Sequence, residues 1–379
     1  MNTVESAPRI ALLADTYYEV NGAARTCREW EAFARERELP FFCVRWGKRP
    51  ALSAHGPVWT MDLVRSRWAV PIDPDLYFDL RFAHLCKLIE PELERFRPDF
   101  IHITSPGDLG ILGAVLAARL KTRLGLSWHT NLHEFAGRRI DQALSFVPAG
   151  PRAAAVRKTE DFVLDKVCWF FGRGDLLFAP NPELIALLAA RTGKPVFPMA
   201  RGVDTTLFTP ARRARGDCDL VLGFVGRLMP EKNLRLLPRV LAELRAAGIR
   251  EVRFQITGHG SEQEWLARHL PQAELTGVLT GEPLARAYAN MDIFLFPSRT
   301  DTFGNVVQEA LASGVSAVVT DSGGPRFIVR DGITGFVASS DDEFCARVLT
   351  IARDEKLRRK MASAARREML EKSWSRVFE

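Results

Sequence analysis

The chain has 379 residues, of which 47% are hydrophobic and 26% are charged. This composition excludes the disordered and fibrous classes of protein, and the length suffices for two domains of ordinary size. The net charge of +6 is compatible with nucleic acid, anionic lipid or phosphorylated ligands, and equally with solubility alone.

The amino terminus and the cysteines bear on where the protein resides. Residues 1–15, MNTVESAPRIALLAD, lack the basic start and apolar segment of a secretory signal, and no run of about 18 apolar residues predicts a spanning helix. The six cysteines are scattered without a Cys-x-x-Cys pair, which argues against a disulfide framework or a zinc ribbon. We therefore expect a cytoplasmic protein.

Short apolar runs recur along the chain, and each is followed by a helical pattern. Continuous apolar strands that alternate with helices are typical of buried parallel sheets in an α/β protein. The predicted strands are residues 9–14, 41–46, 99–104 and 124–128 in the first half, and residues 220–226, 252–258, 292–297 and 317–321 in the second.

A domain boundary is predicted near the middle of the chain. Residues 201–219 are rich in Arg, Pro and Gly without clear periodicity, as in a linker, and a new strand begins directly after them. We therefore predict two Rossmann-like, doubly wound parallel-sheet domains that face each other across a ligand-binding cleft. Residues 354–379 are predicted to form one or two surface helices with an aromatic end that docks on an apolar surface.

The first candidate site is residues 15–24, DTYYEVNGAA, directly after the first predicted strand. A strand, a glycine-containing turn and a helix can point backbone N–H groups at a phosphate, and Gly22 would allow close approach of the backbone. An ordinary strand-to-helix turn explains the pattern equally well.

The second candidate site is residues 226–234, GRLMPEKNL, after the first strand of the second half. Arg227 and Lys232 are cations at a strand end, where they can neutralise a diphosphate leaving group. Pro230 suits the beginning of a helix. The alternative is a solvated surface turn with a Glu231–Lys232 charge pair.

The third candidate site is residues 297–314, PSRTDTFGNVVQEALASG, where a strand ends and a loop leads into a helix. Asp301 and Glu309 are eight residues apart, and carboxylates facing one site can accept hydrogen bonds from sugar and ribose hydroxyls. The alternative is an N-capping Asp and a solvated Glu. The N–H groups at the predicted helix start also suit an anionic or hydroxylated ligand, and they belong to Phe303, Gly304 and Asn305.

The fourth candidate site is residues 127–133, SWHTNLH, at a predicted strand end. His129 lies where an α/β domain presents ligand-facing residues, although a buried or capping histidine is the alternative. His129 and His133 lack the carboxylate of an H-E-x-x-H metal site, so no metal is expected there. The D-x-D triplets at residues 73–75 and 217–219 are interpreted as turn residues.

Taken together, these motifs resemble family 4 retaining glycosyltransferases with the GT-B fold. The resemblance spans nearly the whole chain, and it is closest to GDP-mannose-dependent α-mannosyltransferases, with the UDP-sugar-dependent sulfoquinovosyl-lipid synthases also similar. It is carried by DTYYEVNGAART, SWHTN, RGVDTTLF, GRLMPEKN, FPSRTDTFGNVVQEALASG and the DSGGP loop, in that order.

The resemblance implies a role for each candidate residue and a different ligand for each domain. Residues 1–203 would form the acceptor side, residues 204–360 would bind the nucleotide sugar, and residues 361–379 would return to the first domain. The implied ligands are a nucleotide-sugar donor without metal, and a lipid or glycan acceptor. Catalytic roles fall on His129 and Asp301, and donor binding falls on Gly22, Arg227, Lys232, Phe303, Gly304, Asn305 and Glu309.

One departure affects the donor sugar. The family pattern has Glu at both ends of the eight-residue step, whereas this chain has Asp301 at the first. Asp keeps the charge and loses a methylene of reach. The sequence therefore leaves open a UDP-hexose donor, and also a donor-binding protein without activity.

Basic clusters beside apolar residues suggest peripheral contact with an anionic membrane, at the inner face of the plasma membrane. A nucleotide-sugar epimerase is the alternative enzyme of this architecture, and no nucleic-acid-binding motif is visible. The clusters are Arg65, Arg67 and Trp68, and Arg138, Arg139, Arg152, Arg157 and Lys158.

Overall fold

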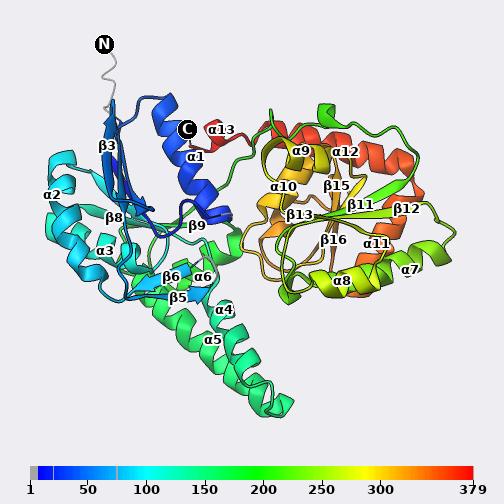
Figure 1. Cartoon of the computed structure of the whole chain (residues 1–379), viewed down its shortest axis with the longest axis horizontal. Coiled ribbons are helices and arrows are strands. Elements are labelled where there is room, and N and C mark those ends of the chain that lie inside the picture. Colours follow the sequence, from blue (N-terminus) through cyan, green and yellow to red (C-terminus); the bar gives the residue numbers. More distant parts are fainter. Residues whose placement is uncertain (1–6, 20, 74–75, 379) are drawn as a thin grey trace. The chain divides into compact units, whose positions relative to one another are not determined.

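The computed structural model describes residues 7–19, 21–73 and 76–378, and it divides into two compact units (Figure 1). Unit 1 comprises Met1–Ala200 together with Phe378, and unit 2 comprises Arg201–Val377 with Glu379. Each unit has its own sheet, so each is described by itself.

Unit 1 is built on an eight-stranded sheet in the order β10-β9-β8-β7-β1-β2-β4-β3. All neighbours are parallel except β3, which pairs antiparallel with β4, and a separate antiparallel ribbon joins β5 to β6. The sequence did not predict these two features. The strands are β1 (Ile10–Ala14), β2 (Phe41–Trp46), β3 (Ala51–His55), β4 (Val58–Leu63), β5 (Ala69–Asp73), β6 (Leu76–Asp79), β7 (Phe100–Ile103), β8 (Arg123–Ser127), β9 (Leu176–Ala179) and β10 (Val196–Pro198).

The helices of unit 1 begin at residues that suit helix starts. Asn21 caps α1 by accepting from the Ala24 N–H at 2.8 Å, and Asn181 caps α6 in the same way with Pro182 following it. In Figure 1, α4 and α5 form a hairpin that extends away from the sheet. The helices are α1 (Gly22–Glu36), α2 (Cys86–Phe96), α3 (Asp108–Leu120), α4 (Leu132–Ala143), α5 (Ala149–Phe171) and α6 (Pro182–Thr192), with a 3-10 turn η1 (Phe82–Leu85).

Unit 2 is built on a six-stranded, wholly parallel sheet in the order β13-β12-β11-β14-β15-β16. The central strands are buried along their whole length, which explains their uninterrupted apolar sequences. The strands are β11 (Leu220–Val225), β12 (Val252–Thr257), β13 (Glu274–Gly277), β14 (Ile293–Phe296), β15 (Ser316–Thr320) and β16 (Gly335–Ala338).

The helices of unit 2 pack around this sheet, and α12 is tied to the start of the unit. Arg366 of α12 donates hydrogen bonds of 2.7 Å to the carbonyl oxygens of Phe208 and Ala312. Trp374 is buried near the end of the chain. The helices are α7 (Leu237–Ala246), α8 (Gln263–His269), α9 (Gly281–Ala289), α10 (Asn305–Ala312), α11 (Asp341–Arg353), α12 (Glu355–Leu370) and α13 (Trp374–Phe378), with 3-10 turns η2 (Pro210–Arg212), η3 (Pro230–Lys232), η4 (Leu234–Leu236) and η5 (Gly324–Phe327).

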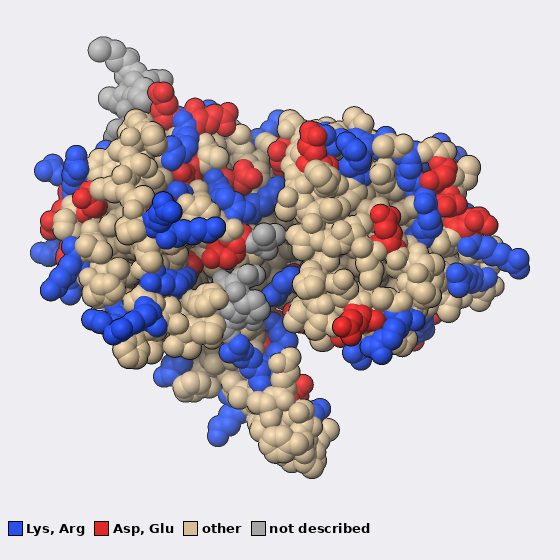
Figure 2. All heavy atoms as spheres, viewed as in Figure 1, with Lys and Arg blue, Asp and Glu red and all other residues tan. Residues whose placement is uncertain are grey.

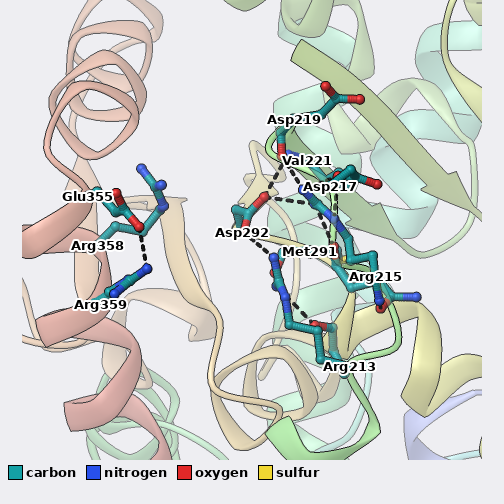
Figure 3. Close-up of polar contacts among 12 residues, drawn as sticks. Arg213, Arg215, Asp217, Asp219, Val221, Met291, Asp292, Glu355, Arg358 and Arg359 are labelled. Carbon is teal, nitrogen blue, oxygen red and sulfur yellow. Dashed lines mark hydrogen bonds and ion pairs between the residues drawn. The ribbon is translucent and has the colours of Figure 1, made fainter. Parts of the chain in front are cut away.

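The segment that precedes β11 is anchored by arginines at the amino-terminal edge of the unit 2 sheet. Figure 3 shows Arg213 and Arg215 converging on Asp292, with N–O distances of 2.8 and 2.9 Å. Asp217 and Asp219 lie on the same segment and pair with Arg253 at 2.7 and 2.9 Å. The carboxylates of the second D-x-D triplet are therefore paired with arginine. The triplet lies at the opposite edge of the sheet from the segments that follow β11 and β14. The first triplet falls partly on residues 74–75, outside the described residues.

Candidate functional site

The carboxyl ends of β11 and β14 bring most of the unit 2 candidates to one edge of the sheet. Because these strands are parallel neighbours, the segments that follow them lie side by side. Arg227 follows β11, Lys232 lies in η3, and Asp301 follows β14. Pro230 begins η3, as the sequence predicts, although the turn is a 3-10 helix of three residues.

Lys232 and Asp301 form an ion pair that joins the two segments. The Lys232 Nζ lies 2.8 Å from Oδ1 and 2.6 Å from Oδ2 of Asp301, and the Ser298 hydroxyl donates to Oδ2 at 2.5 Å. Burial opposes ionisation of Asp301, but the charge and hydrogen bonds of Lys232 outweigh it, so the pKa of Asp301 lies below its ordinary value. The site therefore contains a fixed carboxylate and a fixed ammonium group.

The two surface alternatives considered for these segments are wrong. Lys232 is 8% exposed, and the carboxylate of Glu231 is 3.7 Å from Arg227, so no solvated Glu231–Lys232 pair forms. Asp301 does not cap α10, because the N-cap residue is Gly304. Both side chains are instead held by contacts between the segments that follow β11 and β14.

Glu309 lies on the buried face of α10 and is 4% exposed, which rules out a solvated surface Glu. Its Oε2 accepts a hydrogen bond of 2.9 Å from the hydroxyl of Tyr288, which lies in α9 and is fully buried. Tyr288 was not identified from the sequence, since its only local signal is an aromatic residue on an amphipathic helix. The tyrosine thereby fixes one oxygen of the carboxylate.

The loop before α10 is shaped by close backbone contacts. Gly304 has φ +107°. The DSGGP loop packs against the loop before α10, because the Gly324 N–H donates to the Asp301 carbonyl at 2.7 Å. Phe303 is buried, and the Asn305 Oδ1 is buried without a hydrogen-bond partner in the described part of the chain. An unpaired buried amide oxygen is costly, so Asn305 is suited to receive a donor group from a ligand.

A second glycine loop at this edge was not identified from the sequence. Gly258 follows β12 with φ +140°, and a Cβ there would lie 1.9 Å from the Gly226 carbonyl oxygen. The Leu228 N–H also donates to the His259 carbonyl at 2.9 Å. The signal was present as a Gly-His-Gly triplet after a strand. It brings residues 257–262 beside Arg227 and Lys232.

In unit 1, Gly22 is the first residue of α1, at the carboxyl end of β1. The intervening turn is braced by a buried network. The Tyr17 hydroxyl and Arg45 both donate to Glu31 of α1, at 2.7 and 2.6 Å, and Arg45 also contacts the Tyr17 ring. This network fixes Tyr17, in the turn after β1, against α1 and β2.

His129 follows β8 and is 7% exposed, and it belongs to a chain of buried polar groups. Its Nε2 lies 2.7 Å from the Ser127 hydroxyl, which lies 2.8 Å from Nε2 of His102 on the neighbouring strand β7. Burial lowers the pKa of His102 to about 3, so His102 is neutral. His102 was not identified from the sequence, because its pairing with Ser127 arises only when β7 and β8 align.

A pair of buried carboxyl groups lies at the carboxyl end of β1. Asp15 and Asp108 are 2% and 0% exposed. Burial, followed by the charge of Asp108 and a hydrogen bond with it, raises the pKa of Asp15 to about 8. Asp108 accepts from Trp46 Nε1 at 3.1 Å and from Arg65 Nη1 at 2.9 Å. Arg65, predicted as part of a surface basic cluster, is therefore tied to a buried carboxylate.

No group of three or more His, Cys, Asp or Glu side chains suited to a metal ion is found among residues 7–19, 21–73 and 76–378. His133 packs beside the Trp128 ring, and burial lowers its pKa. The candidate groups described in the two units are therefore ion pairs, carboxylates, histidines and glycine-containing loops.

Comparison with known proteins identifies the family. Residues 20–207 match the profile "Glycosyltransferase Family 4", and residues 219–354 match "Glycosyl transferases group 1". The chain is 33% identical over 289 residues to a GDP-mannose-dependent alpha-mannosyltransferase of Mycolicibacterium smegmatis, covering 74% of this chain and 72% of that one. A protein of the same description from Mycobacterium tuberculosis is 35% identical over 294 residues, covering 74% and 71%. The sulfoquinovosyl transferase SQD2 of Arabidopsis thaliana is 31% identical over 303 residues, covering 75% and 55%.

Solved structures show the same fold at low sequence identity. Sucrose-phosphate synthase of Thermosynechococcus elongatus aligns with a TM-score of 0.69 and 17% identity, covering 97% of this chain and 96% of that one. The HepE protein of Anabaena, solved with UDP and glucose, aligns with a TM-score of 0.66 and 15% identity, covering 97% of both. The chain thus belongs to glycosyltransferase family 4, has the GT-B fold, and is a hexosyltransferase.

Proposed function

We propose that this enzyme transfers mannose from GDP-mannose to a lipid or glycan acceptor, with retention of anomeric configuration and without a metal ion. The observation that carries the proposal is the arrangement at the carboxyl edge of the unit 2 sheet. There an ionised Asp301 is held by Lys232, and a buried Glu309 is held by Tyr288. The mannosyltransferase descriptions of the two mycobacterial relatives support mannose as the sugar.

The donor roles follow from charge and position. We assign Arg227 and Lys232 to the diphosphate, Glu309 to the ribose hydroxyls, and Asp301 with the Phe303–Asn305 backbone to the sugar. Cationic side chains stabilise the negative charge that develops on a leaving diphosphate, as a metal ion does in other enzymes. The carboxylates of the Asp217–Asp219 triplet are not placed to hold a metal ion at the diphosphate, because they are paired with Arg253 at the opposite edge of the sheet.

Retention is assigned to attack on the face of the sugar from which the nucleotide departs. The bond between the anomeric carbon and the acceptor oxygen forms as the bond to the phosphate oxygen breaks. The acceptor's proton passes to that phosphate oxygen, so no protein nucleophile takes part. We assign His129 to the sugar near the reacting carbon and Gly22 to the donor phosphate, with residues 1–203 as the acceptor side, 204–360 as the donor side, and 361–379 returning to the first domain.

Asp301 bears on donor choice. Three hydrogen bonds from Lys232 and Ser298 occupy most of its acceptor capacity, which leaves roughly one lone pair for a sugar hydroxyl. A single contact discriminates weakly between hexoses. The resemblance to sulfoquinovosyl-lipid synthases therefore keeps a UDP-hexose as the second candidate donor.

A thermal-shift panel with GDP, UDP, ADP and their sugars, all in EDTA, tests the donor. A ligand at 100 times its Kd stabilises the protein by about 2.7 kcal/mol, so the preferred nucleotide should be visible. Glu309→Gln keeps the Tyr288 hydrogen bond but removes the charge, and it should abolish the shift. Glu282→Gln, an exposed change on α9, is the matched control. Absence of a shift with every nucleotide would contradict the proposal.

Product analysis separates transfer from epimerisation. A transferase releases free GDP as sugar is transferred, whereas an epimerase returns a different sugar still attached to the nucleotide. Stabilisation that needs added divalent cation would contradict metal independence.

Peripheral contact with an anionic membrane is part of the proposal, because a lipid acceptor resides there. Among the described residues, none of the helices combines the length and apolarity needed to cross a bilayer.

A further inference from the structure

The α4–α5 hairpin of unit 1 is held to the unit only at its base. Its four buried residues are Gly137, Val167, Cys168 and Phe171, three of which lie at the end of α5. A Cβ at Gly137 would lie 2.3 Å from a Glu160 carboxylate oxygen, so the helices approach closely there. With 23 residues, α5 is about 35 Å long. The far end of the hairpin is therefore an extension of the unit, as Figure 1 shows.

The far end of the hairpin is apolar and uncharged. Residues 142–151, QALSFVPAGP, contain no ionisable side chain, and we call them the hairpin tip. Phe146 in the tip is 83% exposed, more than any other large hydrophobic side chain described. In Figure 2 the end of the hairpin is largely free of Lys, Arg, Asp and Glu on the visible face. An exposed apolar chain end of this kind, with several uncharged residues together, can serve as a contact surface for another molecule.

Basic residues gather next to the tip. Residues 132–158 carry five basic and two acidic side chains, whereas residues 159–171 carry one basic and three acidic. One of the two acidic groups, Asp141, is paired with Arg152 at 3.0 Å. Arg157 and Lys158 are exposed. Positive charge therefore borders the apolar tip, and negative charge lies toward the base.

We propose that the hairpin tip inserts into the interfacial region of an anionic lipid bilayer. Interfacial segments bury apolar side chains about 5–10 Å deep, and Arg152, three residues into α5, lies about 5 Å along the helix from its start. Arg157 and Lys158 follow at about 13 Å, within reach of the surface potential of anionic lipid. This inference rests on the proposed membrane contact of the enzyme, and it names the segment that makes it.

A bilayer fits this surface better than a protein partner does. Specific protein interfaces bury about 800 Å² on each partner, and a narrow two-helix end with one prominent aromatic side chain offers much less. A bilayer needs no shape complementarity, and its anionic headgroups match the border of cations.

Vesicle co-sedimentation of the full-length protein tests the proposal, with phosphatidylcholine alone or mixed in equal parts with phosphatidylglycerol. The native protein should bind the anionic vesicles, and added salt should release it. Phe146→Glu should weaken binding at least roughly tenfold. Arg157→Gln with Lys158→Gln should weaken it on the order of tenfold. Phe162→Glu, on an exposed site about 20 Å along α5 from the tip, should leave binding unchanged.

A fluorophore sensitive to polarity locates the insertion. Cys218 is the exposed cysteine and the other five are buried, so Ser145→Cys can be labelled in a Cys218→Ser background. Its emission should shift to the blue with anionic vesicles, whereas a label at Asp161→Cys should not respond.

Three results would overturn the proposal. The first is that the native protein fails to bind anionic vesicles. The second is that Phe146→Glu and the double variant Arg157→Gln, Lys158→Gln bind them as the native protein does. The third is that Phe146→Glu changes only the self-association of the protein in the absence of lipid. Nucleotide-induced stabilisation, measured on the same samples, reports separately on the proposed donor site. Its presence without vesicle binding would reject the hairpin inference and leave the donor assignment standing.

Discussion

The ion pair between Lys232 and Asp301 has a structural and a chemical role that mutation can separate. Lys232→Met leaves a largely buried carboxylate without its cation, which should cost about 2 kcal/mol because Asp301 keeps some solvent access. The double variant Lys232→Met, Asp301→Asn removes both charges and should recover most of that stability. Neither variant should transfer sugar. Denaturant unfolding and an assay of nucleotide release measure the two effects.

Equal stability of the single and double variants would show that the pair does not stabilise the fold. Restored activity in the double variant would contradict the roles proposed for both side chains.

Asp15 gives the stability of the protein a pH dependence of known sign. Its folded pKa of about 8 lies above the ordinary 3.8, so the unfolded chain loses this proton first as pH rises. Stability should fall by about 1.4 kcal/mol per pH unit from near pH 4, and level off above pH 8. Asp15→Asn mimics the protonated acid and keeps an acceptor for the Leu109 N–H. Its stability relative to the native protein should therefore rise from pH 5 to pH 8 in urea unfolding.

The neighbouring groups set the control for this prediction. Asp108 and Arg65 lie next to Asp15 and are unchanged in Asp15→Asn, so a slope that persists in the variant would assign the effect to another group. An unchanged difference between the two proteins across this range would contradict the raised pKa.

Single residues were predictable where the chemistry is local and not where it depends on partners distant in sequence. Lys232, Asp301 and Glu309 stand in recognisable motifs at strand and helix ends. Tyr288 and His102 do not, because each acquires its partner only when separate strands or helices pack. The alternatives that treated Lys232 and Glu309 as surface groups failed for the same reason, since burial comes from tertiary packing.

At the level of elements, the apolar runs predicted the central strands well. The predicted strand at residues 41–46 matches β2, and the helix predicted within residues 297–314 is α10 (Asn305–Ala312). The unpredicted strands lie mainly at sheet edges. β3 is largely exposed and β13 partly so, which gives them no continuous apolar sequence to identify.

The loop before α10 and the DSGGP loop, which we assign to the sugar, depend on glycine contacts, and a matched pair of variants tests this. Gly323 and Gly332 have nearly the same φ, +72° and +71°. A Cβ at Gly323 would lie 2.5 Å from the Asp301 carbonyl oxygen, whereas at Gly332 it would meet nothing within 4 Å. Gly332→Ala should cost about 1 kcal/mol through backbone strain alone. Gly323→Ala should cost about 2 kcal/mol more, and should also weaken nucleotide-sugar binding.

Thermal unfolding and donor titration of both variants check this expectation. Similar losses of stability would show that the loops can separate freely. A Gly323→Ala protein that is destabilised but binds the sugar nucleotide normally would show that the DSGGP loop supports the fold and not the site.

At the scale of the whole molecule, the two units have separate hydrophobic cores. The unit 2 core runs from Val203 to Met369, and the cores of unit 1 lie within residues 11–188. No strand is shared between the two large sheets of the described chain. Length and the repeated strand–helix pattern were enough to predict two α/β domains. The anchoring of the connecting segment by Arg213 and Arg215 on Asp292 was not predictable, because Asp292 is about 80 residues away.

Separate cores predict two transitions in calorimetric unfolding, one for each unit, and only one should respond strongly to nucleotide. Of the residues assigned to the diphosphate and ribose, Arg227, Lys232 and Glu309 lie in unit 2, and Gly22 lies in unit 1. Nucleotide at 100 times its Kd adds about 2.7 kcal/mol, which for a unit of this size raises Tm by roughly 5–10 °C. Glu309→Gln should remove that rise and leave the other transition in place, which identifies the shifted transition as that of unit 2. A single transition that moves as a whole with nucleotide would contradict independent unfolding. If nucleotide raises the Tm of one transition only, and Glu309→Gln does not affect that transition, the nucleotide binds to unit 1. That result would overturn the donor assignment.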